Sequence, residues 1–215
     1  ELQYRVEQLE VEKEIQAERE RISRDLHDNV GAQLVNIISG LDLVERYKKA
    51  SNPEKSDSLL YSLKDDAQNS IGQLRDTIWA LKTEDNTPES LIEHLKSYLD
   101  KIEKLSGLST RVEVENLKSL SLTPTQSLNV FRVVQEAIQN TLKHANASTL
   151  NVYTETNNSQ INLVIEDDGQ FKETDSSNGT NSGLGNMEKR ATSIGGSLSL
   201  IKSNKGTKVI LTLSA

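Results

Sequence analysis

The first part of the chain is an uninterrupted helical run, and this feature restricts the fold most. From Glu1 to about Tyr47 there is no proline, and no glycine precedes Gly31. Apolar residues recur at steps of three, four and seven, with one change of phase between Leu9 and Val11, as in a coiled coil with a stutter. The stripe comprises Leu2, Val6, Leu9, Val11, Ile15, Ile22, Leu26, Val30, Leu34, Ile37, Leu41 and Val44. Such a helix spans on the order of 65 Å and needs a partner helix to bury its stripe.

A second apolar stripe follows a short break. Residues Ala50 to Ser56 include Ser51-Asn52-Pro53, which is typical of a turn. The stripe after the break comprises Leu60, Leu63, Ala67, Ile71, Leu74, Ile78 and Leu81. Two long amphipathic helices with a short connection predict an antiparallel hairpin. Two hairpins make a four-helix bundle, so we expect a homodimer.

The pattern changes after a polar linker at Thr83–Thr87. Thr87 and Thr123 are each followed by proline, which is typical of a helix start. We expect helices at Glu89–Leu105, from Pro124 to about His144 and near Asn186–Ile194, and strands at Arg111–Glu115, Thr149–Thr156, Gln160–Glu166, Ser197–Lys202 and Lys208–Leu213. This half is therefore predicted to be a mixed α/β domain.

Composition excludes several classes of function. The net charge of −7 argues against a nucleic-acid surface, which needs a basic stripe. The chain has no cysteine, so disulfides and thiolate metal sites are excluded. No run approaches the roughly 20 apolar residues of a membrane helix. Because the first residue is Glu1 and no signal peptide is visible, we expect an excised fragment whose parent could carry further segments.

His27 is the centre of the first cluster of reactive side chains. It directly follows the stripe residue Leu26, so it lies at the flank of the helix, where it can reach solvent and another domain. Asp28 can accept a hydrogen bond from one ring nitrogen and leave the lone pair of the other free. An aimed, neutral nitrogen beside a base suits a phosphoryl acceptor. The alternative is a flank histidine with an incidental aspartate.

The helix that follows Pro124 carries the second cluster. Glu136, Asn140 and the pair Lys143/His144 fall one turn apart on one face. A carboxylate, an amide oxygen and a cation in a row suit a Mg²⁺-phosphate group. The alternative is a solvated polar face. The residues expected to face the core are Leu128, Phe131, Val134, Ile138 and Leu142.

Three further motifs occur in order along the chain. Ile165–Gly169 ends a strand, Ser182–Met187 opens a helix, and Gly206–Val209 turns into a strand. A carboxylate in the first can accept a hydrogen bond from an exocyclic amine such as that of adenine, and Gly169 lets the backbone approach a flat ring. Free N–H groups at the start of the helix can hold phosphate oxygens. Taken alone, Asp-Asp-Gly after a strand is usually a turn, a single Gly-x-Gly is weak evidence, and the third motif is weaker still.

In this order the five clusters resemble the sequence boxes of bacterial two-component sensor histidine kinases, from about Glu18 to Leu213. The likeness is to the subfamily whose acceptor helix reads Arg-Asp-Leu-His-Asp and which pairs with helix-turn-helix response regulators. The resemblance implies a cytoplasmic core of a membrane-anchored sensor. Its expected parts are a coiled coil at 1–20, a dimerisation and phosphotransfer hairpin at 21–83, a linker at 84–89 and a Bergerat-type ATP-binding α/β sandwich at 90–215.

The resemblance also implies roles for individual residues. His27 would attack the γ-phosphate of ATP with help from Asp28, and the phosphoryl group would pass to an aspartate of the regulator. Asn140 would hold Mg²⁺, with Glu136 beside the metal. The other implied ATP-binding residues are Lys143 and His144 at the phosphates, Asp167, Gly169 and Thr207 at the adenine, and Gly183, Leu184 and Gly185 at the hinge of a lid formed by Phe171–Ser182.

The chain departs from the family pattern at three positions. Phe171 and Asn181 stand where glycines are usual. Ala32 stands where a glutamine is usual, and Gln33 lies one residue further, about 100° around the helix, so weak phosphatase activity toward the regulator is expected. His94 and Trp79 are expected to pack.

Two alternative functions stay open. One is another ATPase of the same fold, such as an anti-sigma serine kinase or a chaperone-like ATPase. The other is a degenerate kinase that dimerises and relays a conformational change.

Overall fold

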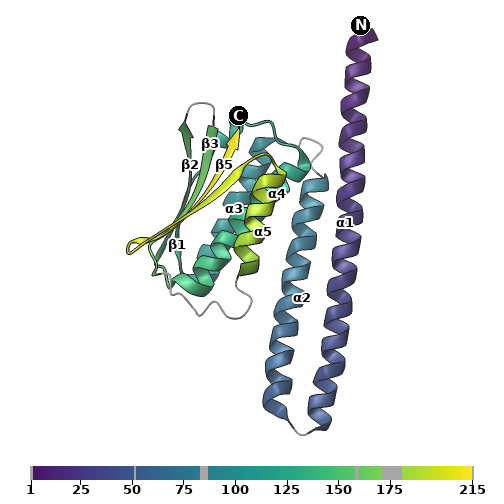
Figure 1. Ribbon diagram of the computed structural model, residues 1–215, viewed down its shortest axis with the longest axis vertical. Coiled ribbons are helices and arrows are strands. Elements are labelled where there is room, and N and C mark those ends of the chain that lie inside the picture. The colour runs from purple at the N-terminus through teal and green to yellow at the C-terminus, as the bar shows by residue number, and fades with distance from the viewer. Residues whose placement is uncertain (1, 51, 83–86, 158–159, 171–180, 215) are drawn as a thin grey trace. The chain divides into compact units, whose positions relative to one another are not determined.

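The computed structural model describes residues 2–50, 52–82, 87–157, 160–170 and 181–214, and in the first helix it describes the side chains continuously only from Gly31 onward. The chain divides into two compact units, Glu1–Lys82 and Thr83–Ala215. The first contains two long helices and the second a mixed sheet with helices (Figure 1). The predicted fold class, a helical hairpin followed by an α/β domain, is confirmed.

The first unit is an antiparallel hairpin of α1 (Leu2–Lys49) and α2 (Pro53–Lys82) (Figure 1). The backbone N–H of Asn52 donates to the Tyr47 carbonyl at 3.0 Å and ends the first helix. The Asn52 side chain then accepts from the Lys55 N–H at 3.3 Å. Helix α2 therefore begins inside the break predicted at 50–56, because proline is tolerated at the first helical position and Asn52 caps the turn.

The two helices of the hairpin approach closely at Gly40. A Cβ atom at this position would collide with the Leu63 side chain. Val44 and Leu63 are buried between the helices. Many other apolar side chains of the hairpin stay exposed, namely Leu34, Val35, Ile38, Leu41, Leu43, Leu60, Tyr61, Ile71 and Ile78. One hairpin thus covers only part of the two predicted stripes.

The described residues of the second unit form five strands and three α-helices, which agrees with the pattern of elements predicted from the sequence. They are α3 (Pro88–Ser106), β1 (Ser109–Glu113), α4 (Pro124–Asn140), β2 (Thr149–Asn157), β3 (Gln160–Asp167), α5 (Asn181–Ser193), β4 (Ser197–Ser203) and β5 (Gly206–Ser214). Two short turns of helix, η1 (Glu115–Ser119) and η2 (Thr141–Ala145), complete the described elements.

The strands form one sheet in the order β1-β2-β3-β5-β4. β1 pairs with β2 in parallel, and the other pairs are antiparallel. The parallel pair needs a crossover, which η1 and α4 supply. Figure 1 shows α3, α4 and α5 on one face of this sheet.

The helix starts of this unit are where the sequence predicts them. The Thr87 hydroxyl caps α3 by accepting from the Ser90 N–H, and Pro88 is the first helical residue. Thr123 and Gln126 form a complete capping box at the start of α4. Gly107 ends α3 with a φ of 72°, a conformation that glycine adopts without strain.

The core lies between the helices and the sheet. Buried residues recur every three or four positions on α3 and α4 and alternate along the central strands. Fully buried members include Leu91, Leu95, Leu99, Val130, Phe131, Val134, Ile138, Leu150, Val152, Leu163 and Leu211. Burying one such side chain contributes about 1.5–3 kcal/mol. Four of the five residues predicted to face the core from α4 do so.

Leu142 is the exception, because its side chain is 41% exposed. The predicted helix continues to about His144, but α4 ends at Asn140 and a π turn follows. Thr141 keeps the α-helical bond to the Ala137 carbonyl and is buried, and the π turn changes the phase of the residues after it. The core prediction for Leu142 is therefore wrong.

Two other boundaries differ from the sequence expectation. Strand β1 ends at Glu113, and the buried Val114 opens the η1 turn. Helix α5 begins at Asn181, five residues before the predicted start near Asn186. Glycines are tolerated in a first helical turn, where N–H groups lack intrahelical partners. None of the described helices is long and apolar enough to cross a membrane.

Candidate functional site

Glu136 and Asn140 lie one turn apart near the end of α4, as predicted. The start of α5 lies against both. A Cβ atom at Gly183 would be 2.5 Å from Glu136 Oε1 and 3.9 Å from Asn140 Nδ2. The fold therefore brings together the carboxylate–amide row and the glycine motif, which are more than forty residues apart in the sequence.

Asp167 is the best-defined polar group of this region. It ends β3, its side chain is buried, and its oxygens have three hydrogen-bond donors. Oδ1 accepts from the backbone N–H groups of Gly169 at 3.0 Å and Thr207 at 3.3 Å. Oδ2 accepts from the Thr141 hydroxyl at 3.0 Å. Donors of this kind offset the cost of burying a carboxylate.

Two glycines allow the backbone to close around Asp167. A Cβ atom at Gly206 would overlap the Asp167 carbonyl oxygen, and the residue has a φ of 135°, which other residues rarely adopt. A Cβ atom at Gly169 would collide with the Ala145 carbonyl. The neighbouring Gln170 N–H donates to that same carbonyl at 2.8 Å. β3, β5 and the η2 turn therefore meet with no room for larger residues.

Thr207, whose backbone N–H donates to Asp167, also carries a buried hydroxyl. Its side chain is 9% exposed, and its hydroxyl has no hydrogen-bond partner among the described residues. An unsatisfied buried hydroxyl is costly, and such a group is explained by a water or ligand that satisfies it. The hydroxyl of Thr207 therefore still has a hydrogen bond to offer to a water or ligand.

The other predicted residues of this region form the rim. Lys143 is exposed and His144 is half-buried, and both lie in the η2 turn rather than in α4. Leu184 and Gly185 are half-buried in the first turn of α5. A Cβ atom at Gly185 would meet nothing within 4 Å, so no close approach explains that glycine.

Some of the predicted site lies outside the described residues. His27 and Asp28 are on α1, in the helical unit, but their side chains are not among those described. The same holds for Phe171 and for the side chain of Asn181. Ala32 is exposed, and Gln33 donates from Nε2 to Gln73 Oε1 on α2 at 3.1 Å.

Arg190 contributes to the site from α5 and was not predicted. Its Nη1 donates to Asn129 Oδ1 on α4 at 3.1 Å, and Asn129 Nδ2 donates to Ser193 Oγ at 3.4 Å. Burial lowers the pKa of the Arg190 guanidinium, and the negative charge of Glu136 acts in the opposite direction. Arg190 therefore joins α5 to the face of α4 that carries Glu136.

Asp168 has a structural role, although it adjoins Asp167. Its Oδ1 accepts from the backbone N–H groups of Ser148 and Thr149, each at 2.8 Å. The bond from the Thr149 N–H is the main reason that the pKa of the Asp168 carboxyl is lowered. The carboxylate holds the start of β2 beside the end of β3.

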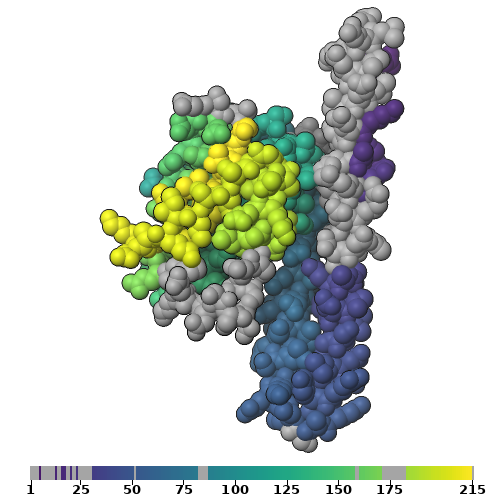
Figure 2. Space-filling view, viewed as in Figure 1, coloured from purple at the N-terminus to yellow at the C-terminus, as the bar shows by residue number. Residues whose placement is uncertain are grey.

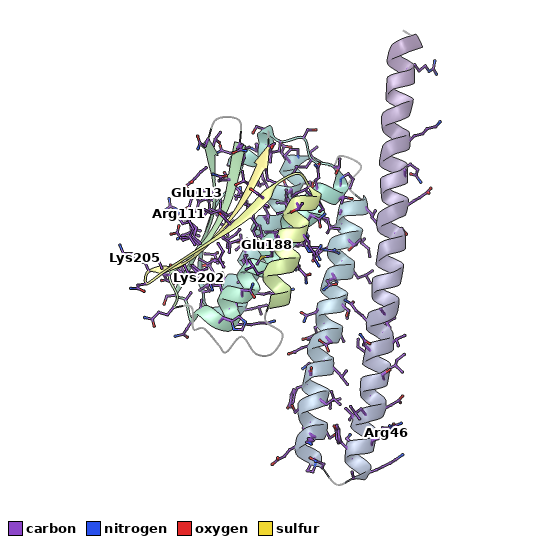
Figure 3. All side chains as sticks on the ribbon, viewed as in Figure 1. Arg46, Arg111, Glu113, Glu188, Lys202 and Lys205 are labelled. Atoms are coloured by element: carbon purple, nitrogen blue, oxygen red, sulfur yellow. The ribbon has the colours of Figure 1, made fainter. Side chains whose placement is uncertain are left out.

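Charged side chains also lie at the two edges of the sheet, near the edge strands β1 and β4. Arg111 donates to Glu113 on the edge strand β1 at 2.9 and 2.6 Å (Figure 3). Lys202 and Lys205 lie on the β4–β5 hairpin (Figure 3), which projects from the sheet (Figure 2). Charges on edge strands oppose unwanted strand pairing.

The order of elements, a helical hairpin followed by an α/β unit, is shared with solved histidine kinase structures. The structure resembles the histidine kinase domain of the Erythrobacter litoralis EL346 blue-light activated histidine kinase, with a TM-score of 0.56 and 17% identity over 86% of this chain and 95% of that one. It also resembles the Acinetobacter baumannii histidine kinase AdeS, with a TM-score of 0.54 and 14% identity over 84% of this chain and 96% of that one. At these identities the likeness concerns the fold.

Sequence comparison identifies the family. Residues 18–86 match HisKA_3, a histidine kinase family. The chain is 30% identical to the signal transduction histidine-protein kinase/phosphatase DegS of Brevibacillus brevis, over 91% of this chain and 51% of that protein. It is 29% identical to the sensor histidine kinase LiaS of Bacillus subtilis, over 91% of this chain and 53% of that protein.

The chain therefore carries a HisKA_3 domain and resembles sensor histidine kinases over most of its length, as the motifs predicted. It spans about half the length of these curated relatives.

Proposed function

We propose that the chain is the kinase core of a two-component sensor, which transfers the γ-phosphoryl group of ATP to His27 and then to an aspartate of a response regulator. The main support is the buried carboxylate of Asp167 with its three donors, next to the unsatisfied Thr207 hydroxyl, in the same chain as a HisKA_3 hairpin. The proposed parts are those of the sequence analysis, with the coiled coil at 1–20, the hairpin at 21–83, the linker at 84–89 and the ATP-binding domain at 90–215.

The adenine ring is proposed to bind beside Asp167. The carboxylate would accept a hydrogen bond from the exocyclic amine, and the Thr207 hydroxyl would bond a ring nitrogen directly or through water. Gly169, which the close contact with Ala145 requires to lack a side chain, would lie beside the ring.

The phosphates are proposed to lie between α4 and the start of α5. Asn140 and Glu136 offer oxygen atoms, which are the ligands that Mg²⁺ prefers, and the close approach of Gly183 keeps side-chain bulk away from them. Asn140 would hold Mg²⁺, with Glu136 beside it, and the bound ion would neutralise phosphate charge. Lys143 and His144 would approach the phosphate oxygens, and Gly183, Leu184 and Gly185 would offer N–H groups at the helix start.

His27 is proposed as the phosphoryl acceptor. One neutral ring nitrogen attacks the γ-phosphorus, the bond from phosphorus to the bridging oxygen breaks, and ADP leaves with that electron pair. The ring becomes positively charged, and Asp28 accepts the proton of the other nitrogen in a hydrogen bond. Positioning and charge neutralisation supply most of the rate enhancement in reactions of this type.

The proposed assembly is a homodimer through the hairpin, since one hairpin leaves many apolar side chains exposed. The proposed partner is a response regulator with a helix-turn-helix output domain. Anchoring in a membrane would come only from segments upstream of this chain, whose own position would be cytoplasmic.

Phosphatase activity toward the regulator is proposed to be weak. Ala32 stands where the family usually has glutamine, and the nearby Gln33 is hydrogen-bonded to Gln73. The relative DegS is described as a kinase/phosphatase, so the activity can be compared between the two proteins. Fast dephosphorylation by the wild-type chain that Gln33→Ala abolishes would contradict the proposal.

The test is incubation of the purified chain with γ-labelled ATP and Mg²⁺. Wild type should acquire acid-labile, alkali-stable label, and His27→Gln and Asn140→Asp should each lose it. The matched control is Asn116→Asp, the same substitution at an exposed asparagine outside α4, and this variant should label normally. Bound ATP without label would favour another ATPase of this fold, and absence of ATP binding would favour a relay that has lost catalysis.

A further inference from the structure

The Thr141 hydroxyl lies 3.0 Å from Asp167 Oδ2, and both side chains are buried, with 5% and 6% of their surfaces exposed. The two residues are 26 positions apart in the sequence. Thr141 lies on the buried face that α4 presents, three positions after the buried Ile138, and the π turn η2 begins at this residue. Short π turns next to α-helices are frequent at functional sites.

The Thr141 hydroxyl has two acceptors within reach and one proton. The Ala137 carbonyl is 3.2 Å away, at the helical i−4 position. That carbonyl already accepts the backbone N–H of Thr141. A hydrogen bond to an ionised carboxylate is roughly twice as strong as one to a neutral acceptor. The Thr141 hydroxyl therefore donates its hydrogen bond to Asp167 Oδ2.

The remaining capacity of the carboxylate can be counted. An ionised carboxylate has about four acceptor positions, two on each oxygen. Oδ1 accepts from Gly169 and Thr207, so both of its positions are used. Oδ2 accepts only from Thr141 among the described residues. One acceptor position of the carboxylate is therefore left among the described contacts, and it is on Oδ2, the oxygen that accepts from Thr141.

We propose that Thr141 is a positioning residue that turns the last acceptor position of Asp167 toward the exocyclic amine of adenine, and so sets the preference for ATP over purine nucleotides that lack this amine. The inference rests on the proposed function, because it assigns the Asp167 pocket to adenine. Thr141 does not touch the nucleotide in this scheme and acts through Asp167.

The test compares binding of ATP and inosine triphosphate, which has a carbonyl in place of the amine, by calorimetry in the presence of Mg²⁺. Thr141→Val keeps the shape and removes the hydroxyl, so ATP binding should weaken about tenfold, which is about 1.4 kcal/mol. Binding of inosine triphosphate should not change. Thr141→Ser should restore the preference, since it keeps the donor.

Thr192→Val is the matched control. The Thr192 hydroxyl makes the same i−4 bond, to the Glu188 carbonyl at 2.9 Å, on an exposed part of α5. Loss of this hydroxyl should leave both nucleotide affinities unchanged. If Thr141→Val weakens binding of both nucleotides equally, or of neither, the inference is overturned. The first result is what a purely structural role predicts, and the second is what the absence of any role predicts.

The two levels of proposal fail differently. If wild type binds ATP more tightly than inosine triphosphate and Asp167→Asn removes the preference, the adenine site stands and only the role of Thr141 is at stake. If wild type binds neither nucleotide, the proposed function and this inference both fail.

Discussion

The helical hairpin and the α/β unit differ in how far they bury their apolar residues. In the hairpin, Ile38 and Tyr61 are 59% and 71% exposed, and only a few large apolar side chains, such as Val44 and Leu63, are buried. In the α/β unit, Leu91 and Leu163 are fully buried. The second unit completes its core within one chain, whereas the hairpin needs a further surface to cover its stripes. The folding of the hairpin should therefore depend on association.

The largest expected effect is on assembly. Leu34→Glu combined with Ile38→Glu puts charges on one exposed face of α1, since the two positions are four residues apart. Burying unpaired charges is costly, so the dimer dissociation constant should rise by more than about 100-fold, or about 2.7 kcal/mol. Sedimentation velocity would measure it, and ATP binding should not change. Ser39→Glu, at an exposed polar position, is the control; a persistent dimer in the double variant would refute the assignment of this face.

The next effect concerns the complete core. Phe131→Ala removes a side chain that is 1% exposed, so the free energy of unfolding of the α/β unit should fall by about 3–5 kcal/mol at any protein concentration. Leu60→Ala in the hairpin should cost less, and its cost should depend on protein concentration. Urea unfolding followed by hydrogen exchange separates the two units. Equal concentration dependence of both variants would contradict the comparison.

A smaller effect is expected at the start of α4. Thr123→Ala removes the hydroxyl that accepts from the Gln126 N–H at 3.3 Å, and loss of such a cap costs about 1 kcal/mol. Thr123→Asn should recover most of it, because asparagine caps helices well. Thermal unfolding of the α/β unit measures the difference, and equal stability of all three proteins would show that the cap is unimportant.

The smallest effect depends on pH. Asp168→Ala removes the acceptor of two backbone N–H groups at the start of β2, and the loss should be at most about 1 kcal/mol because the side chain is exposed. The pKa of Asp168 is lowered in the folded chain, so its contribution is full above the unfolded value of about 4. It is lost as the pH falls through the folded value. The stabilities of wild type and variant should therefore converge in acid and differ at neutral pH.

Local sequence signals predicted most of the elements. Thr87-Pro88 and Thr123-Pro124 mark two helix starts correctly, because capping depends on neighbouring residues alone. The five strands were expected within a few residues of their observed bounds. The η1 turn and the π turn η2 were not predicted, because each depends on how its residues pack against the sheet. Leu142 shows the consequence, since a continued α-helix would have turned it inward.

The sequence singled out residues of the candidate site but not the contacts between them. The spacing of Glu136 and Asn140 places both on one helical face, and Asp167 was singled out at the end of its strand. Thr141 and Arg190 were missed. A polar residue three positions after Ile138, on the buried face of α4, was the available signal for Thr141.

The sequence by itself determined the two long stripes, the helix caps and the order of the motifs, because these depend on residues within a few positions of one another. Only the tertiary structure decided two of the three partners of Asp167, Thr141 and Thr207, which come from 26 and 40 positions away. It also decided the bond from Arg190 to Asn129, 61 positions apart. Such contacts follow from the register of β3 with β5 and from the packing of α5 on α4, which no local pattern encodes.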